Sequence, residues 1–259
     1  ALQLKPNHPD AHNNLGNALK MQGDLTAAIA SYNSALQLKS NFPDAHNNLG
    51  NALQEQGDLT AAIASYNSAL QLKSNYPDAH YNLGVALKEQ GDLDEALINH
   101  KIALSLDPKN SNAFYGIGLV QAVQGNLNGS KNSFLKSIEL NPSNTAALLE
   151  LSRNIKSIEE LDELAKKLDE VTRTGLNKRQ ESMLEFAAVN LNHQSKNYTK
   201  AAQQILRANK LKLSFYPSDV SKHLLQTKKI MKLARQIIAG NPSDGEGKIF
   251  IVGAPRCGS

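Results

Sequence analysis

The sequence predicts an all-helical solenoid, and three observations carry that prediction. The chain repeats itself with a constant period of 34 residues, each repeat carries two apolar stripes at helical spacing, and a Gly-Asp pair separates the two stripes in the first three repeats. A single helix hairpin cannot bury both of its stripes, so neighbouring hairpins are expected to stack on one another.

The repeats occupy residues 1–144 of the 259-residue chain. Residues 9–42 recur at 43–76 with three changes, a third copy spans 77–110, and a divergent fourth copy spans 111–144. Residues 1–8 match the end of a repeat whose beginning is absent, so we expect the chain to start inside a unit.

Each repeat is expected to form one helix hairpin. In the first repeat, Ala11, Leu15, Ala18 and Leu19 recur at helical spacing, and we expect this stripe to face the core of its own hairpin. A second stripe follows the Gly-Asp pair. The missing N–H of proline is harmless in the first turn of a helix, and proline opens three repeats, at Pro9, Pro43 and Pro77.

These repeats resemble the tetratricopeptide repeat family. The residues that carry the resemblance are Leu15-Gly16, Gly23, Ala28, Tyr32 and Ala35, and in the next repeat Leu49-Gly50, Gly57, Ala62, Tyr66 and Ala69. The resemblance implies a right-handed superhelix of stacked helix pairs over residues 1–144.

Three histidines, His12, His46 and His80, stand where that family often has a large aromatic residue. Equivalent positions on packed helices lie about 8–10 Å apart, whereas the ligands of one metal ion lie about 2 Å from it. We therefore expect the histidines to pack between helices, and we predict no metal site.

One side of the first helix of each repeat is rich in asparagine. In the family that the sequence resembles, this side lines the concave groove, and asparagine ladders occur there in O-linked N-acetylglucosamine transferases. An Asn amide offers both a donor and an acceptor, so a row of them predicts a groove that grips the backbone of an extended peptide. The predicted peptide-binding residues are Asn13, Asn14, Asn17, Asn47, Asn48, Asn51, Tyr81 and Asn82.

Two other interpretations of this ladder stay open. The amides could form solvated surface, or they could join adjacent helices through hydrogen bonds to the backbone. A groove for acidic peptide tails is not expected, because Asn13, Asp78 and Asn82 stand where such grooves carry cations. The fourth repeat instead presents apolar residues, namely Tyr115, Leu119, Ala122 and Val123.

After residue 144 the strict period disappears but helical patterning continues. The expected helices are 145–154, 158–172, 179–193, 198–211 and 218–239. Residues 179–213 read as a decayed repeat. The run "AGNPSDGEG" (239–247) breaks the helical series, so we divide the chain into a repeat array (1–144), a divergent helical region (145–239) and a last segment (240–259).

The last segment, "KIFIVGAPRCGS" (248–259), reads as a short strand followed by a glycine-rich loop. Such a loop crowds backbone N–H groups around an anion, but Ser259 stands where a P-loop has its lysine. The segment resembles the 5′-phosphosulfate-binding loop of sulfotransferases, and the whole order looks like bacterial tetratricopeptide-sulfotransferase proteins. The resemblance assigns the anion cradle of 3′-phosphoadenosine 5′-phosphosulfate to Gly253, Arg256, Gly258 and Ser259.

Composition and charge narrow the class of protein. The apolar runs are too short for a membrane helix, and neither a signal peptide nor a motif for nucleic acid is present, so we expect a soluble cytoplasmic protein that binds neither membrane nor nucleic acid. The charges that sum to +4 are unevenly distributed along the chain. Residues 9–110 include 6 basic and 11 acidic residues, whereas residues 145–259 include 19 basic and 12 acidic residues.

Taken together, the sequence favours a scaffold that binds a peptide or protein in its groove, with self-association as a further use of the groove. We expect it to be the front part of a sulfotransferase-like polypeptide, cut inside the donor loop, without cofactor or catalysis of its own. The alternatives are a sulfotransferase that binds its donor with this chain, and a free-standing adaptor.

Overall fold

The computed structural model describes residues 7–153, 157–171 and 174–215, and all secondary structure in these ranges is helical. The predicted all-α fold is therefore confirmed. The expected helix 218–239, the linker and the terminal strand lie outside the described residues. The chain divides into two compact units, residues 1–147 and 148–259.

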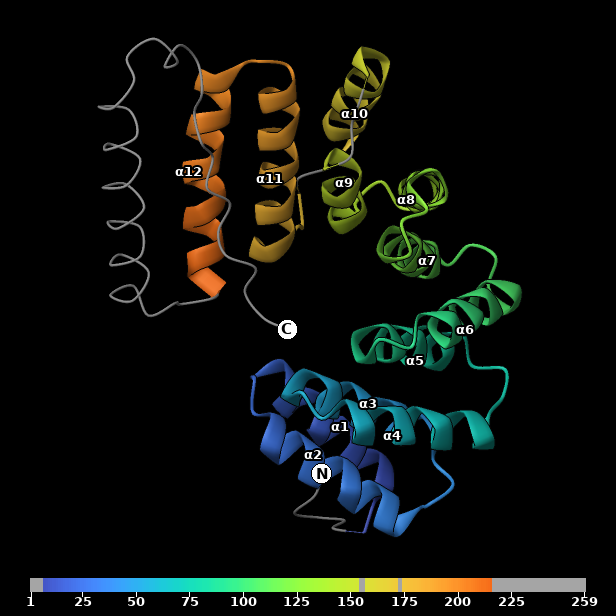
Figure 1. Ribbon diagram of the computed structural model, residues 1–259. Coiled ribbons are helices and arrows are strands. Elements are labelled where there is room, and N and C mark those ends of the chain that lie inside the picture. The colour runs from blue at the N-terminus through green and yellow to red at the C-terminus, as the bar shows by residue number, and fades with distance from the viewer. Residues whose placement is uncertain (1–6, 154–156, 172–173, 216–259) are drawn as a thin grey trace, which may run out of the picture. The chain divides into compact units, whose positions relative to one another are not determined.

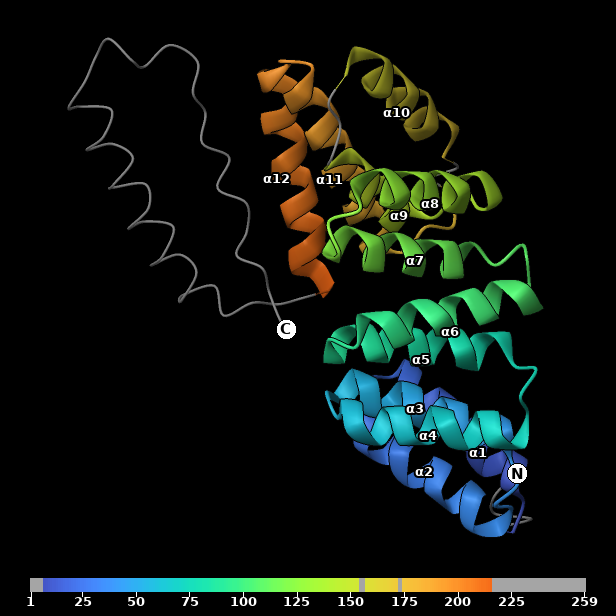
Figure 2. The ribbon, with the colours of Figure 1, turned by 45° about the vertical axis from the view of Figure 1, so that its right-hand side comes forward.

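The first unit contains four helix hairpins, which follow one another in a stack (Figures 1 and 2). Each hairpin consists of an odd-numbered and an even-numbered helix joined by a short turn. The helices are α1 (Pro9–Met21), α2 (Leu25–Leu38), α3 (Pro43–Gln56), α4 (Leu59–Leu72), α5 (Pro77–Gln90), α6 (Leu93–Leu106), α7 (Ser111–Val123) and α8 (Leu127–Leu140).

The turns inside the first two hairpins share one chemistry. Gly57 adopts a positive φ of 95°, which only glycine reaches without strain, and the next residue, Asp58, accepts a hydrogen bond from the Ala61 backbone N–H at 3.0 Å. In the first hairpin Asp24 caps Ala27 in the same way. The Gly-Asp pair therefore ends one helix and starts the next.

Packing within the array is shared between neighbouring repeats. Leu49 and Ala52 of α3 join one buried cluster with Ala28 and Tyr32 of α2, the even-numbered helix of the preceding repeat. In the third repeat, Leu83 and Ala86 of α5 share a cluster with Tyr66 of the preceding repeat and also with Ala96 of their own hairpin partner, α6. In the first repeat, by contrast, Leu15 and Ala18 are exposed. The expectation that the stripe is covered by its own hairpin is thus wrong for these two residues, because the stack supplies the second surface that covers it.

The second unit contains another hairpin of the same type. After α9 (Thr145–Ser152), at the junction of the units, come α10 (Ile158–Glu170), α11 (Lys178–Gln194) and α12 (Tyr198–Phe215). In the turn between α11 and α12, the Asn197 backbone N–H donates to the Asn192 carbonyl, as the Asp58 N–H does to Leu53. Ala201 and Ala208 are buried. Most of 179–213 thus forms a helix hairpin, with Lys196 at φ 59° in place of the turn glycine, and its origin as a decayed repeat stays a prediction.

Candidate functional site

The odd-numbered helices of the first unit share one side that neither their hairpin partner nor the adjacent repeat covers. Residues three or four positions apart lie on the same side of a helix, and here they are exposed or half-buried. We call this surface the odd-helix face. Its residues are Asp10, Asn14, Asn17 and Met21; Asp44, Asn48, Asn51 and Glu55; Asp78, Asn82, Val85 and Glu89; and Asn112, Leu119 and Val123.

Hydrogen bonds join successive odd-numbered helices along the edge of this face. Asn48 Nδ2 donates to Asn13 Oδ1 at 3.1 Å, and one repeat later Asn82 Nδ2 donates to Asn47 Oδ1 at 3.0 Å. Each bond links a residue to the one 35 positions on, which is one position beyond its equivalent in the next repeat. We call these bonds rungs.

Two further rungs have the same spacing and involve charged groups. Lys20 Nζ donates to Glu55 Oε1 at 2.9 Å, and Gln54 Nε2 donates to Glu89 Oε2 at 2.9 Å. The side chains of α1, α3 and α5 are therefore ordered relative to one another before any ligand arrives.

A buried tyrosine in each of the first two repeats orients a second set of amides. Tyr32 Oη donates to Asn17 Oδ1 at 2.8 Å, and Tyr66 Oη donates to Asn51 Oδ1 at 2.8 Å. Both rings are fully buried. Burial raises the pKa of Tyr32 to about 12, with a smaller contribution from Glu55, so the phenol stays a donor at neutral pH.

The predicted binding residues fall into two groups. Asn14 is exposed, and Asn17, Asn48, Asn51 and Asn82 are half-buried on the odd-helix face. Tyr81 is half-buried at the position equivalent to Asn13 and Asn47, with its ring centre 5.6 Å from that of His100. Asn13 and Asn47, by contrast, are only 7% and 5% exposed. The expectation that all eight lie open to a ligand is wrong for these two, because each faces the following odd-numbered helix and accepts a rung. The interpretation of stitched helices holds for them, with a side-chain amide as partner.

The chemistry of the face changes towards the fourth repeat. The positions that would continue the rungs beyond α5 are Gly116 and Val123, which carry no polar side chain. The place of Tyr32 and Tyr66 is taken by His100 and then Phe134.

The amide partners change in step with these rings: Asn17 and Asn51 give way to Val85 and Leu119. The polar half of the odd-helix face thus ends at α5, and an apolar half follows, with Val123 65% exposed.

His100 fills the buried slot of the third repeat without any hydrogen bond. The side chain is 0% exposed, and both ring nitrogens lack a partner. A Cβ on either Gly84 or Gly116 would approach the ring to 2.5–2.7 Å, so two glycines clasp it from two helices. Burial, with a smaller effect of Lys88, lowers the pKa of His100 to about 4.

The histidines that the sequence singled out take part in packing. His46 Nε2 donates to the Ser40 carbonyl at 3.0 Å, and His80 Nε2 donates to the Ser74 carbonyl at 3.1 Å. Each imidazole therefore ties the start of one repeat to the loop that leaves the preceding one. Within the described ranges, no three His, Cys, Asp or Glu side chains are arranged to hold a metal ion.

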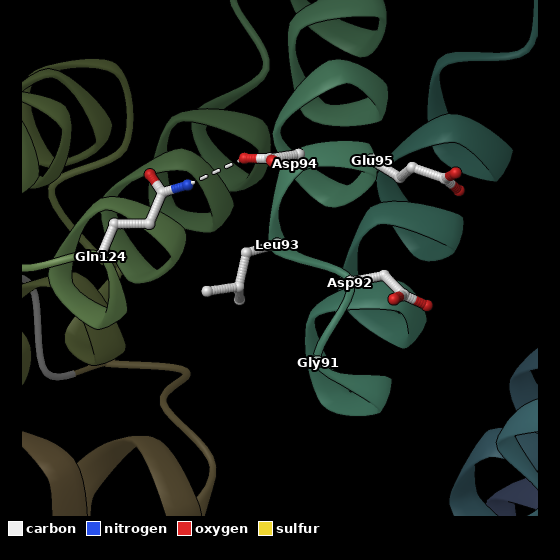
Figure 3. Close-up of a pocket in the computed structure, with 6 residues that line it drawn as sticks. All are labelled: Gly91, Asp92, Leu93, Asp94, Glu95 and Gln124. Carbon is white, nitrogen blue, oxygen red and sulfur yellow. Dashed lines mark hydrogen bonds between the residues drawn. The ribbon is translucent and has the colours of Figure 1, made fainter.

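A shallow hollow beside the turn between α5 and α6 is a second candidate site (Figure 3). Gln124 Nε2 donates to Asp94 Oδ1 at 3.3 Å across it. Asp92 and Glu95 point to the other side of the helix, so the three carboxylates do not converge (Figure 3). This geometry offers no common ligand position for them.

The predicted anion cradle, comprising Gly253, Arg256, Gly258 and Ser259, lies outside the described residues. Its role remains a prediction.

Family profiles match the first unit of the chain. A profile described as "TPR repeat" matches residues 17–57 and 51–91, and two described as "Tetratricopeptide repeat" match residues 1–30 and 77–110. Residues 1–110 are tetratricopeptide repeats. A comparison with curated protein sequences found no match.

Solved structures with the tetratricopeptide fold resemble the chain at low identity. The pilF protein of Pseudomonas aeruginosa is 24% identical with a TM-score of 0.63, over 85% of this chain and 97% of that one. YrrB is 22% identical with a TM-score of 0.52, over 66% and 91%. A MamA fragment from Desulfovibrio magneticus RS-1 is 17% identical with a TM-score of 0.50, over 80% and 96%. At these identities the likeness establishes the tetratricopeptide fold alone.

In the part of the chain that the structure describes, no helix has both the length and the apolar character that crossing a bilayer requires.

Proposed function

We propose that the chain is a scaffold that binds an extended peptide segment of a partner protein on the odd-helix face. The observation that carries the proposal is that half-buried amides on this face are held in place through one side-chain atom, while the structure records no hydrogen bond for the other among the described residues. Asn51 accepts from Tyr66 through Oδ1, which leaves Nδ2 to donate. Asn48 donates to Asn13 through Nδ2, which leaves Oδ1 to accept.

A peptide backbone presents the complementary groups, one N–H and one C=O per residue. Fixing the amides in advance lowers the entropy lost on binding, since the side chains are already ordered. A row of oriented donors and acceptors suits recognition of a main chain independently of its side chains. The fold is also compatible with this use, because YrrB is described as a tetratricopeptide protein with an unusual peptide-binding site.

The test is selection of peptides from a random display library on the full chain, followed by two double variants. Asn14→Trp with Glu55→Trp places two indoles on the odd-helix face, at exposed positions. Ala30→Trp with Ala64→Trp adds the same bulk at exposed positions of α2 and α4. We expect the first variant to abolish binding of the selected peptides and the second to retain it. Equal binding by both would place the site elsewhere.

The sequence of residues 248–259 supports a second proposal, that this chain itself binds the sulfuryl donor at the resembling loop. Its test is calorimetry with 3′,5′-adenosine diphosphate on the full chain and on the Arg256→Ala variant. Micromolar binding that the variant loses would support donor binding. Absence of binding would leave the chain as a scaffold without catalysis of its own.

A further inference from the structure

Going beyond peptide binding as such, we propose that the occupant of the odd-helix face is a cationic segment that ends in a bulky apolar residue. This inference rests on the proposed function and adds the chemical class of the partner. The charge of the polar half of the face and the apolar character of its other half carry it.

Carboxylates dominate the polar half of the odd-helix face. It holds five of them, Asp10, Asp44, Glu55, Asp78 and Glu89, and only two lysines, Lys20 and Lys88, flank it. All five acidic residues are exposed, and both lysines are half-buried. An approaching chain therefore meets carboxylates first.

The hydrogen bonds within the face leave most of this charge uncompensated. Lys20 pairs with Glu55, but the donor to Glu89 is the neutral Gln54 amide, and the donor to Asp44 is the neutral Tyr76 hydroxyl at 2.9 Å. A neutral donor orients a carboxylate without cancelling its charge. Like charges gathered on one surface attract cations and repel an acidic chain.

The apolar half gives the occupant a direction. On α7, Val123 is 65% exposed, and Leu119 and Ala122 are half-buried. The α7 positions that would continue the rungs from α5 carry no polar side chain. The α7 part of the odd-helix face has no carboxylate to pair with a Lys or Arg side chain, whereas an aliphatic or aromatic side chain would bury apolar surface there. The two halves together select a segment with basic residues at one end and an apolar residue at the other.

The length of the segment follows from helix packing. Four odd-numbered helices about 8–10 Å apart span roughly 24–30 Å. An extended peptide rises about 3.3 Å per residue, so about nine residues cover the face. Alternate side chains point the same way, so every second residue contacts the helices.

The probe is a fluorescein-labelled nine-residue peptide with Lys at positions one, three, five and seven, Leu at position nine and Ser between them. It is compared, in both chain directions, with peptides that carry Gln or Glu in place of every Lys, and with one that carries Ser in place of Leu. Binding to the full chain is followed by fluorescence anisotropy at low and high salt. We expect the Lys peptide to bind most tightly, to weaken with salt, and to lose affinity when its Leu is replaced.

A matched pair of triple variants assigns the effect to the face. Glu55→Gln, Asp78→Asn and Glu89→Gln together remove three charges and keep the side-chain shapes, and we expect affinity for the Lys peptide to fall about tenfold. Asp162→Asn, Asp169→Asn and Glu170→Gln remove as many charges at exposed positions of α10, and affinity should not change. Helical circular dichroism confirms that both variants fold.

The outcomes separate this inference from the proposed function. Equal affinity for the Lys and Gln peptides, or an equal loss in both triple variants, overturns the cationic partner and leaves peptide binding in place. The same holds if the display library yields only neutral or acidic binders. A library that yields no binder at all overturns the proposed function as well.

Discussion

The first and second repeats differ in sequence at only three positions, yet the same leucine has different surroundings in each. Leu15 is 38% exposed, whereas its equivalent Leu49 is 9% exposed. Ala18 is exposed, whereas Ala52 is 0% exposed. The reason is that α2 covers this side of α3, while no helix among the described residues covers it on α1. Burial in this array is thus set by the neighbouring repeat, as a nearest-neighbour solenoid requires.

The largest expected effect tests this difference directly. Leu49→Ala should lower the free energy of unfolding by about 2–5 kcal/mol, because it opens a cavity between α2 and α3. Leu15→Ala, in the same local sequence, should lower it by less than about 1 kcal/mol. Urea unfolding followed by circular dichroism measures both. Equal losses would mean that the repeat's own sequence, and not its neighbour, decides the burial.

The third repeat differs from the first two because its buried ring, His100, can make the stability of the fold depend on pH. The pKa of His100 is about 4 in the folded chain and about 6.5 when the side chain is exposed. As the pH falls, the imidazole is therefore protonated in the unfolded chain before it is protonated in the folded chain. Stability from the neutral imidazole is complete above pH 6.5 and is lost as the pH falls towards 4, by about 3 kcal/mol in total. Unfolding titrations between pH 7 and 4 should show this loss in the natural chain.

The control is His100→Phe, since Phe134 fills the same slot in the next repeat. This variant removes two unpartnered buried nitrogens, so we expect it to be more stable by about 1–2 kcal/mol at pH 7 and less sensitive to acid. An unchanged acid response in the variant would assign the loss to other groups.

A smaller effect compares the two buried tyrosines. Tyr66 Oη donates to Asn51 and also lies 2.9 Å from Gln54 Oε1, whereas Tyr32 has the single contact with Asn17. Each hydroxyl has one proton to donate, so the two acceptors of Tyr66 share it, and Tyr66→Phe and Tyr32→Phe should each lower stability by about 1 kcal/mol. Thermal unfolding of the two variants side by side compares them, and a clearly larger loss for Tyr66→Phe would show that the contact with Gln54 adds to stability.

The smallest effect exchanges turn residues between the units. Lys196 occupies a positive φ, so Lys196→Gly should raise stability by about 0.5 kcal/mol. Gly57→Lys should lower it by about 1 kcal/mol through backbone strain alone, because nothing lies within 4 Å of the added Cβ. Two stabilities that move in the same direction would contradict a purely conformational cause.

Much of the fold could be predicted because it depends on local signals. The 34-residue period, the Gly-Asp turn and the opening prolines located the helices of the array, and α10 and α11 begin within one residue of the expected positions. The rungs could not be predicted, since they depend on how far one odd-numbered helix is shifted along the next. A shift of one residue decides that Asn13 contacts Asn48 and not Asn47, and thereby that Asn13 is buried.

The candidate site was predicted in composition but not in detail. The asparagines of the polar half were recognised as a set, and the change to apolar residues in the fourth repeat was visible. Tyr32 and Tyr66 were assigned only to packing, although their hydroxyls orient the amides of the odd-helix face. The two positions of each pair change together along the array: Tyr occurs with Asn in the first two repeats, His100 with Val85 in the third, and Phe134 with Leu119 in the fourth. This joint change was the signal in the sequence that could have revealed the role of the tyrosines.

The buried ring position, occupied by Tyr32, Tyr66, His100 and Phe134 in successive repeats, also constrains how such an array can diverge after duplication. Losing the half-buried asparagine first would strand a hydroxyl in a space that water does not reach. Losing the hydroxyl first leaves an amide that water can still solvate. When a repeat with a Tyr and Asn pair changes towards one with apolar residues at both positions, we therefore expect the tyrosine to be replaced before the asparagine that accepts its hydrogen bond.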